Sequence, residues 1–320
     1  MNKLKYLLFL SIGFSTTLVV PTEYPTIFDG LNASSEGDTV LILDGLYSGV
    51  GNVGIEFLGG PDIVLISESG PANCIIDCNY DGRWLYLGNS SWEIIGFTIK
   101  NGMSDEGGAL RFYGYGEPQI DHCIFYNNTS TWIGGAISIV ITDPTFKNCV
   151  FYGNTSLTTA GDIIGDALFS HIDFYNSILV GHNGSAEYGI DLYYSCSLDT
   201  VGSSGTLREG AFIGDPLMVD PELGNFTLQL ESPCINAGNP DDPHDFDNTR
   251  IDIGVSPFIL ELLGDANFDG VVDVLDVVVV VEFILYDLDS YNAQLWAMNI
   301  NLDDDIDIID IVLLVDVILN

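Results

Sequence analysis

The sequence has very little positive charge. Its 320 residues hold 8 Lys and Arg against 46 Asp and Glu, which gives a formal net charge of −38 at pH 7. Nucleic acids and anionic membrane surfaces carry charge of the same sign, so both would be repelled over most of the protein surface. The composition therefore excludes nucleic acid and anionic membranes as expected partners.

A long hydrophobic run at the N-terminus is also missing. The apolar segment Tyr6 to Phe14 follows Lys3 and Lys5 and is too short for a membrane span. A basic start, a short apolar stretch and then small residues are typical of a secretory signal peptide. We therefore expect a signal peptide over residues 1–20, no stable membrane span after its removal, and a secreted, extracellular or cell-surface protein. An uncleaved anchor is the alternative, because no Ala-x-Ala cleavage site is present.

Zinc-type cysteine spacing is absent as well. The Cys74–Cys78 pair has no second pair and no nearby His to complete a zinc site. The cysteines of an exported chain can be oxidised, so disulfides and buried thiols are both possible here. The six cysteines are Cys74, Cys78, Cys123, Cys149, Cys196 and Cys234.

Acidic residues dominate the C-terminal region instead. From Glu261 onward there are fourteen Asp and Glu and no Lys or Arg. The twelve residues from Asp265 to Asp276 carry oxygen ligands at positions 1, 3, 5, 7, 9 and 12 and Gly270 at position 6, which is the spacing of an EF-hand-type calcium loop. The ligands predicted for this loop are Asp265, Asn267, Asp269, the backbone carbonyl of Val271, Asp273 and Asp276.

A second copy of the loop follows at an offset of 34 residues. Asn at its first position and Asp304 in place of the turn glycine predict that this second site binds Ca²⁺ more weakly. The match continues through the aliphatic segments that follow, so each unit is a loop plus a helix. The ligands predicted for the second loop are Asn299, Asn301, Asp303, the backbone carbonyl of Asp305, Asp307 and Asp310.

This duplicated unit, residues 264–320, resembles a type I dockerin. The resemblance implies a calcium module that docks into a cohesin receptor. Its helical segments are apolar nearly all round, so we expect one face to pack within the module and the other to contact a partner. Val274-Leu275 and Ile308-Ile309 replace the polar or small residues that the family usually has there. The partner is therefore cohesin-like, another hydrophobic protein, or a second copy of this chain.

The body of the chain repeats short strand-like segments. The four clearest copies, at offsets of 27, 26 and 28 residues, begin at Gly96, Cys123, Cys149 and Ser177. Strands this short cannot bury a face alone, so a near-constant period in this range predicts coils that stack. Stacking is expected to place Asn101, Asn128 and Asn154 in one ladder. It also brings Cys123 next to Cys149. These two residues form either a disulfide or, which we favour, two small apolar side chains of the core.

Two further segments resemble known β-helices. Tyr24 to Tyr47, with its Gly37-Asp38-Thr39-Val40 strand, resembles the opening of pectin-lyase-like right-handed parallel β-helices, in which a short helix caps the first coil. Gly214 to Gly254 resembles the terminal coil of exported β-helix proteins, with Arg250 expected to pair with nearby carboxylates such as Asp252. We therefore predict a mainly β protein. Residues 21–255 form a right-handed parallel β-helix, 256–263 a linker, and 264–320 a small helical calcium module.

The body shows no catalytic signature. The Asp-Asp and His-Gly pairs typical of polygalacturonases are absent, and Arg111 is the best candidate base for a lyase, although an ordinary ladder residue is favoured. Asp166 and Asp191 could line one face as a hydrolase pair, and Tyr113, Tyr115, Trp92 and Trp132 could stack on sugars. For each of these residues the alternative is an ordinary structural role in a turn. Catalytic residues therefore stay unassigned.

Together these patterns predict an exported β-helix protein that a calcium-dependent module attaches to a scaffold or envelope partner. The favoured role is non-catalytic, with carbohydrate or a surface as ligand. Two alternatives stay open: a polysaccharide lyase or glycoside hydrolase of a cellulosome-like assembly, and a self-assembling filament or matrix subunit.

Overall fold

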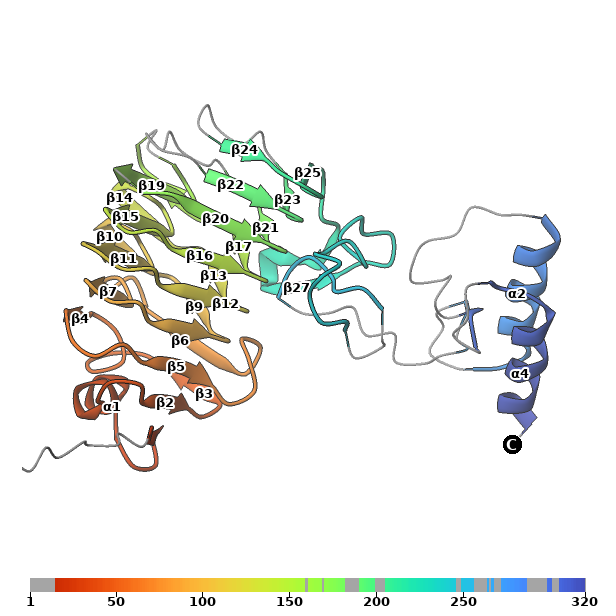
Figure 1. Cartoon of the computed structure of the whole chain (residues 1–320), viewed down its shortest axis with the longest axis horizontal. Helices are drawn as coiled ribbons and strands as arrows, with labels where there is room; N and C mark the ends of the chain where they lie inside the picture. Colours follow the sequence, from red (N-terminus) through yellow and green to blue (C-terminus); the bar gives the residue numbers. More distant parts are fainter. Residues whose placement is uncertain are drawn as a thin grey trace, which may run out of the picture.

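The body of the protein is a right-handed parallel β-helix (Figure 1). The computed structural model describes residues 15–158, 161–168, 170–181, 190–198, 205–245, 249–255, 264, 266–267, 272–286, 298–300 and 305–319. The apolar part of the expected signal peptide and the expected linker lie outside these residues. The predicted fold class, mainly β with a few short C-terminal helices, is confirmed.

Four parallel sheets run along the β-helix. The nine-stranded sheet contains β1 (Thr17–Val20), β2 (Thr39–Ile42), β5 (Val64–Ser67), β8 (Glu93–Ile95), β12 (Gln119–Asp121), β16 (Thr145–Lys147), β20 (Ile172–Tyr175), β22 (Ile190–Tyr193) and β24 (Gly205–Leu207). The eight-stranded sheet contains β3 (Gly45–Tyr47), β6 (Cys74–Asp77), β9 (Thr98–Lys100), β13 (Ile124–Tyr126), β17 (Val150–Tyr152), β21 (Ile178–Leu179), β23 (Cys196–Ser197) and β25 (Phe212–Ile213). The five-stranded sheet contains β4 (Ile55–Leu58), β7 (Leu85–Gly88), β11 (Leu110–Tyr113), β15 (Ile137–Val140) and β19 (Ile164–Leu168). The three-stranded sheet contains β10 (Met103–Glu106), β14 (Thr129–Ile133) and β18 (Thr155–Ser156).

The core is a set of stacked side chains inside the coils. In a parallel stack each residue lies about 4.8 Å from its counterpart on the next strand, so like residues pack on one another. Phe125 of β13 stacks on Phe151 of β17 with ring centroids 4.7 Å apart, and Phe146 of β16 stacks on Phe174 of β20 at 5.1 Å. All four rings are completely buried. The alternation of apolar and polar residues along each strand therefore sets which side chains fill the interior.

A turn of two residues joins the nine-stranded to the eight-stranded sheet in five successive coils. Its first residue adopts positive φ, at Gly96 (84°), His122 (49°), Asn148 (51°), Asn176 (48°) and Tyr194 (47°). Gly and Asn reach this left-handed region most easily, which explains three of these residues. The strand direction therefore changes within two residues.

The expected asparagine ladder forms, but one step shorter than predicted. The buried Asn128 side chain donates from Nδ2 to Oδ1 of Asn154 (3.0 Å) and to the carbonyl of Ile99 (3.0 Å). The Asn154 amide donates in turn to the carbonyl of Phe125 (2.8 Å). Side-chain amides thus satisfy the turn backbone from one coil to the next.

Asn101 does not belong to this ladder. The register pairs Lys100 with Tyr126, so the residue that lies beside Asn128 is Gly102, whose N–H donates to Oδ1 of Asn128 (2.8 Å). The predicted offset of 27 residues between these coils is therefore wrong by one. Asn101 instead donates to Asp77 (2.9 Å).

The N-terminal end is capped as predicted. Helix α1 (Ile27–Ala33) begins after Thr26, whose hydroxyl accepts from the N–H of Asp29 (3.2 Å). The first strand, β1, pairs with β2 and buries Leu18 and Val20. Residues 17–20, which the sequence assigns to the expected signal peptide, are therefore the first strand of the β-helix.

Residues 214–255, called the covering segment below, do not form a further coil. Their β26 (Met218–Asp220), 3-10 helix η1 (Pro221–Leu223) and β27 (Asn225–Leu228) form an antiparallel hairpin. Apolar residues of this segment pack on the outer face of the eight-stranded sheet, in one cluster with Ile124, Val150 and Ile178. The expectation of a terminal coil is therefore wrong. A large apolar face of the sheet is covered by a later part of the chain (Figure 1).

Arg250, which was expected to pair with carboxylates of this segment, bonds to backbone carbonyls. Arg250 donates to the carbonyl oxygens of Ala237 (3.2 Å) and Gly238, and its guanidinium lies 5.6 Å from the ring centroid of Tyr194. Asp252 accepts from the N–H of Asn236 (2.7 Å). Among the described residues Arg250 thus bonds to backbone carbonyls, and Asp247, another carboxylate expected near it, lies outside these residues.

Two helices follow, α2 (Val274–Tyr286) and α4 (Ile308–Leu319), which lie side by side (Figure 1). They share a small core of their own, built on Ala266, Val280, Met298 and Leu314. Among the described residues, neither these helices nor α1 combine the length and apolar character needed to cross a bilayer.

Candidate functional site

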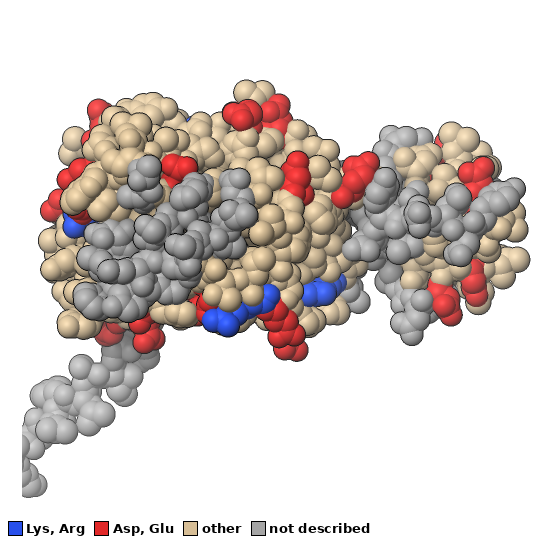
Figure 2. All heavy atoms as spheres, turned by 90° about the horizontal axis from the view of Figure 1, so that it is seen from above, with Lys and Arg blue, Asp and Glu red and all other residues tan. Residues whose placement is uncertain are grey.

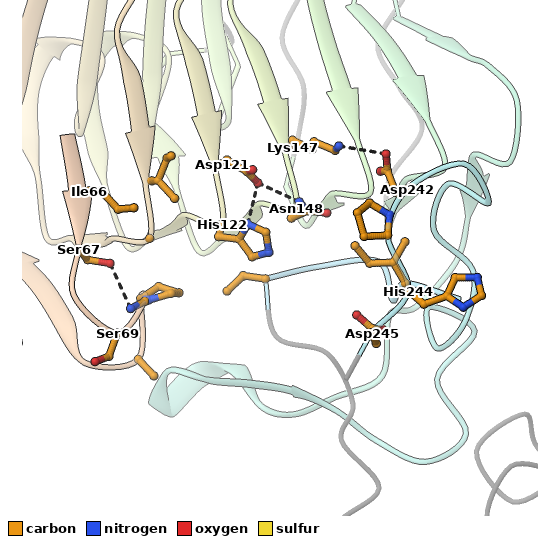
Figure 3. A pocket seen from close by; sticks show the side chains of 18 residues that line it. Ile66, Ser67, Ser69, Asp121, His122, Lys147, Asn148, Asp242, His244 and Asp245 are labelled. Atoms are coloured by element: carbon orange, nitrogen blue, oxygen red, sulfur yellow. Dashed lines mark hydrogen bonds and ion pairs between the residues drawn. The ribbon is translucent and has the colours of Figure 1, made fainter. Parts of the chain in front are cut away.

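A cleft lies where the nine-stranded sheet meets the covering segment (Figure 3). Its floor is formed by outward side chains at the ends of successive strands, Ile66, Ile95, Asp121 and Lys147, and its far wall by residues 242–245 together with Ile251 and Val255. The cavity volume is about 670 Å³. Small-molecule sites usually have about 300–1,000 Å³ and a mostly apolar lining with a few polar groups, so this cleft has the size and character of a binding site.

An Asp–His pair points into this cleft. Nδ1 of His122 lies 2.8 Å from Oδ1 of Asp121, and Nδ2 of Asn148 donates to the same oxygen (2.8 Å). With Nδ1 engaged by the carboxylate, Nε2 is the nitrogen left to act on a ligand. His122 stands at a left-handed turn position where neighbouring coils have Gly or Asn, so its imidazole is not required by the turn.

The environment keeps Asp121 ionised. Burial alone would raise its pKa, but the hydrogen bond and charge of His122, the bond from Asn148 and the charge of Lys147 together lower the pKa below its ordinary value. The contact between Asp121 and Nδ1 of His122 fixes the orientation of the imidazole ring. The pair is therefore arranged as an oriented acid–base group.

The wall of the cleft is fixed to its floor by a second polar contact. Nζ of Lys147 pairs with Oδ1 of Asp242 (3.1 Å), and Nδ2 of Asn176 donates to Oδ2 of the same carboxylate (2.8 Å). The covering segment is thus held over the sheet by a basic residue of β16 and a turn asparagine. Basic side chains are few on the face shown in Figure 2. One basic side chain of the protein, that of Lys147, holds the wall of the cleft.

The outward face of the nine-stranded sheet continues beyond the cleft. In register with Lys147 are Tyr175 and Tyr193, whose rings stack with centroids 4.7 Å apart. Two residues before these tyrosines, on the same outward face, Asp173 of β20 is in register with Asp191 of β22. A strip of aromatic and carboxylate groups therefore extends from the cleft across the strands.

The two aspartates of this strip have different surroundings. Asp191 is almost completely buried and its Oδ2 lies 2.9 Å from the guanidinium of Arg208. Nε2 of His171 lies 3.2 Å from Asp173 and 3.6 Å from Asp191, and single ligand atoms of His171, Asp173 and Asp191 all lie within 4.8 Å of one another. Burial, and then the charge of Asp191, raise the pKa of Asp173 against the lowering effects of His171 and Arg208. One carboxyl group is thus biased toward the protonated form beside one that is paired with a cation, the pattern of an acid and its partner base or nucleophile.

Three other residues proposed from the sequence have different roles. Arg111 pairs with Glu106 and lies 5.0 Å from the ring centroid of Tyr86, so its guanidinium is engaged on the five-stranded sheet. Trp92 is completely buried and donates to the carbonyl of Pro61 (2.9 Å), so the sugar-stacking role is wrong. Asp166 lies on β19 of the five-stranded sheet and Asp191 on β22 of the nine-stranded sheet, so these two cannot line one face as expected.

The two predicted calcium loops are described in part. Asp265, Asp269, Val271, Asn301 and Asp303 lie outside the described residues. The described members are Asn267, Asp273, Asp276, Asn299, Asp305, Asp307 and Asp310.

The described part of each loop has the same arrangement around its last aspartate. Oδ2 of Asp276 accepts from the N–H of Asp273 (2.8 Å), and Oδ2 of Asp310 accepts from the N–H of Asp307 (2.8 Å). Oδ1 of Asp276 accepts from the N–H of Asn267 (3.0 Å), across the loop. Asp276 and Asp310 are both completely buried at the start of their helices. The sequence offset of 34 residues is thus matched by a repeated local structure.

Sequence reasoning missed the cleft and the Asp173–Asp191 strip. The residues of the cleft wall come from a segment more than 100 residues later than His122, so no local motif joins them. Asp173 and Asp191 are separated by 18 residues, a shorter coil than the period of 26–28 found earlier in the chain. Alternating polar residues in Asp173-Phe174-Tyr175 and Asp191-Leu192-Tyr193 were the available signal.

The architecture defines a parallel β-helix protein with an open outward face and a helical C-terminal pair. No protein-family model matches the chain, and no curated protein matches it. Among solved structures the chain is similar to the pectate lyase Pel9A, at 12% identity over 77% of this chain and 97% of that chain, with a TM-score of 0.35. A likeness at this level assigns no activity, substrate or site residue to the present chain.

Proposed function

We propose that this is an exported β-helix protein which is attached to a protein partner by a calcium-dependent C-terminal module, and whose body binds a ligand on its outward face. The observation that carries the docking role is an exposed apolar surface on α2 and α4. It is made by equivalent residues of the two repeats, and each is between 49% and 69% exposed. The matching pairs are Val274 with Ile308, Leu275 with Ile309, and Val278 with Val312.

Exposed apolar residues in this number rarely remain uncovered in a soluble protein. Here they recur at the same positions of both repeats, so the surface is a property of the repeat rather than a single exposed side chain. An apolar partner surface of matching shape fits it best. A cohesin-like receptor, another hydrophobic protein and a second copy of this chain remain the candidate partners.

Calcium fits the described part of the loops. Asp276 and Asp310 are completely buried carboxylates that accept from backbone N–H groups of their own loops, and residues 264–320 contain no Lys, Arg or His. Ca²⁺ prefers carboxylate and carbonyl oxygens, which are the ligands that both loops offer. Bound Ca²⁺ would add positive charge to this acidic region and hold both loops against their helices.

Calorimetric titration of the chelator-treated whole chain with Ca²⁺ tests this proposal. Two sites are expected, and D276N and D310N should each remove one, because Asn keeps the hydrogen-bond acceptor but loses the charge. Asp44→Asn, at an exposed position of the β-helix, serves as the matched control and should bind as the wild type does. Absence of calcium uptake, or uptake that both loop variants leave unchanged, contradicts the proposal.

The docking surface is tested separately by hydrogen exchange and sedimentation velocity with and without Ca²⁺. Calcium should slow exchange in residues 274–286 and 308–319 and leave the β-helix unchanged. If a second copy is the partner, the sedimentation coefficient rises with concentration in Ca²⁺, and Val312→Glu abolishes the rise. A monomer at all concentrations would leave the cohesin-like and other hydrophobic partners, to be tested by direct binding. Unchanged exchange in both helices argues against a calcium-dependent module.

Glycoside hydrolysis is a second candidate function, and the Asp173–Asp191 pair favours it. Retaining glycosidases place two carboxyl groups about 5–5.5 Å apart, one as the acid and one as the nucleophile. Oxygens of Asp173 and Asp191 lie within 4.8 Å of each other, and the pKa of Asp173 is raised by burial. In this candidate Asp173 protonates the leaving oxygen, and Asp191, oriented by its ion pair with Arg208, attacks the sugar carbon. The Tyr175–Tyr193 stack would flank the sugar.

Release of reducing ends from a panel of polysaccharides measures this activity. D173N and D191N should each lower kcat by several orders of magnitude, whereas Asp143→Asn, on the loop before β16, should have little effect. Activity that both variants retain, or no turnover of any substrate by the wild type, leaves the non-catalytic binding role.

A further inference from the structure

Two cysteines meet in the apolar layer between the eight-stranded sheet and the covering segment. Cys196 lies on β23 in register with Ile178 and Phe212, so its side chain faces outward from the coil. Cys234 belongs to the covering segment. Both are completely buried in one cluster with Ile178 and Met218.

Both cysteines lie beside the first residues of the covering segment. Sγ of Cys196 donates to the carbonyl of Gly214 (3.3 Å). The N–H of Cys234 donates to Oγ of Ser232 (3.2 Å), and that hydroxyl donates to the carbonyl of Pro216 (2.6 Å). One cysteine thus comes from the sheet and the other from the segment packed on it, in one buried cluster, and a disulfide between them requires Cβ atoms about 3.5–4.5 Å apart.

The other neighbouring pair, Cys123 and Cys149, has a different geometry. These residues are in register on adjacent coils, so their side chains run parallel at about the strand spacing of 4.8 Å, beyond the usual Cβ separation of a disulfide. Each thiol donates to a carbonyl of its own turn, Cys123 to Asp121 (3.3 Å) and Cys149 to Lys147 (3.1 Å). They are buried core thiols, as the sequence favoured.

We propose that Cys196 and Cys234 form a disulfide in the mature protein, and that this bond clamps the covering segment to the last coils of the β-helix. With glutathione disulfide as the oxidant, the thiolate of one cysteine attacks it and releases one glutathione. The thiolate of the other cysteine then attacks the mixed disulfide and releases a second. The two protons lost by the cysteines pass to the two released glutathione thiolates, so electrons and atoms balance.

The clamp lies close to the wall of the ligand cleft. Cys234 precedes Asp242, which pairs with Lys147 across the cleft, by eight residues. A cross-link at Cys234 therefore restricts the segment that forms this wall. Contact with Cys196 and then burial raise the pKa of Cys234 strongly, so little thiolate exists in the folded state. The bond is consequently expected to form before the covering segment packs, and to resist reductants afterwards.

Alkylation of the whole chain tests the proposal. The protein is refolded from denaturant with glutathione and glutathione disulfide, its folded state is verified by circular dichroism, and it is then unfolded and alkylated without reductant. Four of the six thiols should react in the wild type, the two in the bond being protected. Cys123→Ser, the matched control, should give three of five, and Cys196→Ser should give five of five.

Peptide mapping locates the bond. Trypsin cuts after Lys147, Arg208 and Arg250, so residues 148–208 and 209–250 should appear as one cross-linked species before reduction and as two after it. This species should persist in Cys149→Ser and disappear in Cys196→Ser. Six reactive thiols in the folded wild type, or a cross-link that survives in Cys196→Ser, would overturn the proposal.

A thermal measurement separates a clamp from an incidental bond. Reductant added during unfolding should lower the melting temperature of the wild type and of Cys123→Ser by several degrees, and should leave that of Cys196→Ser unchanged. An equal response of all three proteins would show that the bond does not hold the covering segment.

Discussion

Replacing Asn128 by Ala tests how far side-chain amides hold the coils together. Asn128 is completely buried, and its amide makes two donor bonds, to Ile99 and Asn154, while its oxygen accepts from Gly102. Alanine removes all three. Leaving the Gly102 N–H unsatisfied costs about 1–3 kcal/mol and each lost donor bond about 0.5–1.5 kcal/mol, so the free energy of unfolding should fall by about 2–6 kcal/mol.

Urea unfolding, followed by far-UV circular dichroism, measures this change. With a slope of about 3 kcal/mol per molar urea, the midpoint should fall by about 0.7–2 M. Asn73→Ala is the matched control, since Asn73 is exposed in the turn before β6, and its effect should stay within about 0.5 kcal/mol. If both variants shift the midpoint equally, or if Asn128→Ala shifts it by less than the control range, the amide ladder does not stabilise the stack.

The remaining predictions concern the core, the cleft and its pH dependence. Phe151→Ala should lower the free energy of unfolding by about 3–5 kcal/mol, because it empties the completely buried ring that stacks on Phe125, and urea midpoints measure it. His122→Asn should keep the melting temperature, since Asn suits the left-handed turn, but should weaken any ligand of the cleft; a large loss of stability would show instead that the imidazole is structural. Because the folded pKa of Asp121 lies below the unfolded value of about 3.9, its carboxylate stabilises the protein above about pH 4, and this stabilisation is lost as the pH falls through the folded pKa. Asp121→Asn should therefore flatten the fall in melting temperature below about pH 4, and an unchanged slope would contradict this assignment.

The repeat in the sequence by itself determines the parallel stack. Short strands that recur every 26–28 residues can bury their apolar side chains only against the next coil. The repeat at an offset of 34 residues likewise predicts two C-terminal loop–helix units. The capping helix, observed as Ile27–Ala33, was instead implied by the resemblance of Tyr24 to Tyr47 to the opening of known β-helices.

Register was less certain, as Asn101 shows. A shift of one residue between two coils moves a side chain from the ladder to the neighbouring turn position, and hydrophobic spacing alone did not resolve it. The backbone pairing of Lys100 with Tyr126 decided the matter.

Only the tertiary structure decided where residues 214–255 lie and what they create. Their apolar side chains pack on the outward row of Ile124, Val150 and Ile178, which would otherwise be exposed to water. This packing brings Asp242 to Lys147, closes the cleft over His122, and places Cys234 in one buried cluster with Cys196. Contacts between residues so far apart in the chain follow from the packing of whole segments, so no spacing within the sequence could specify them.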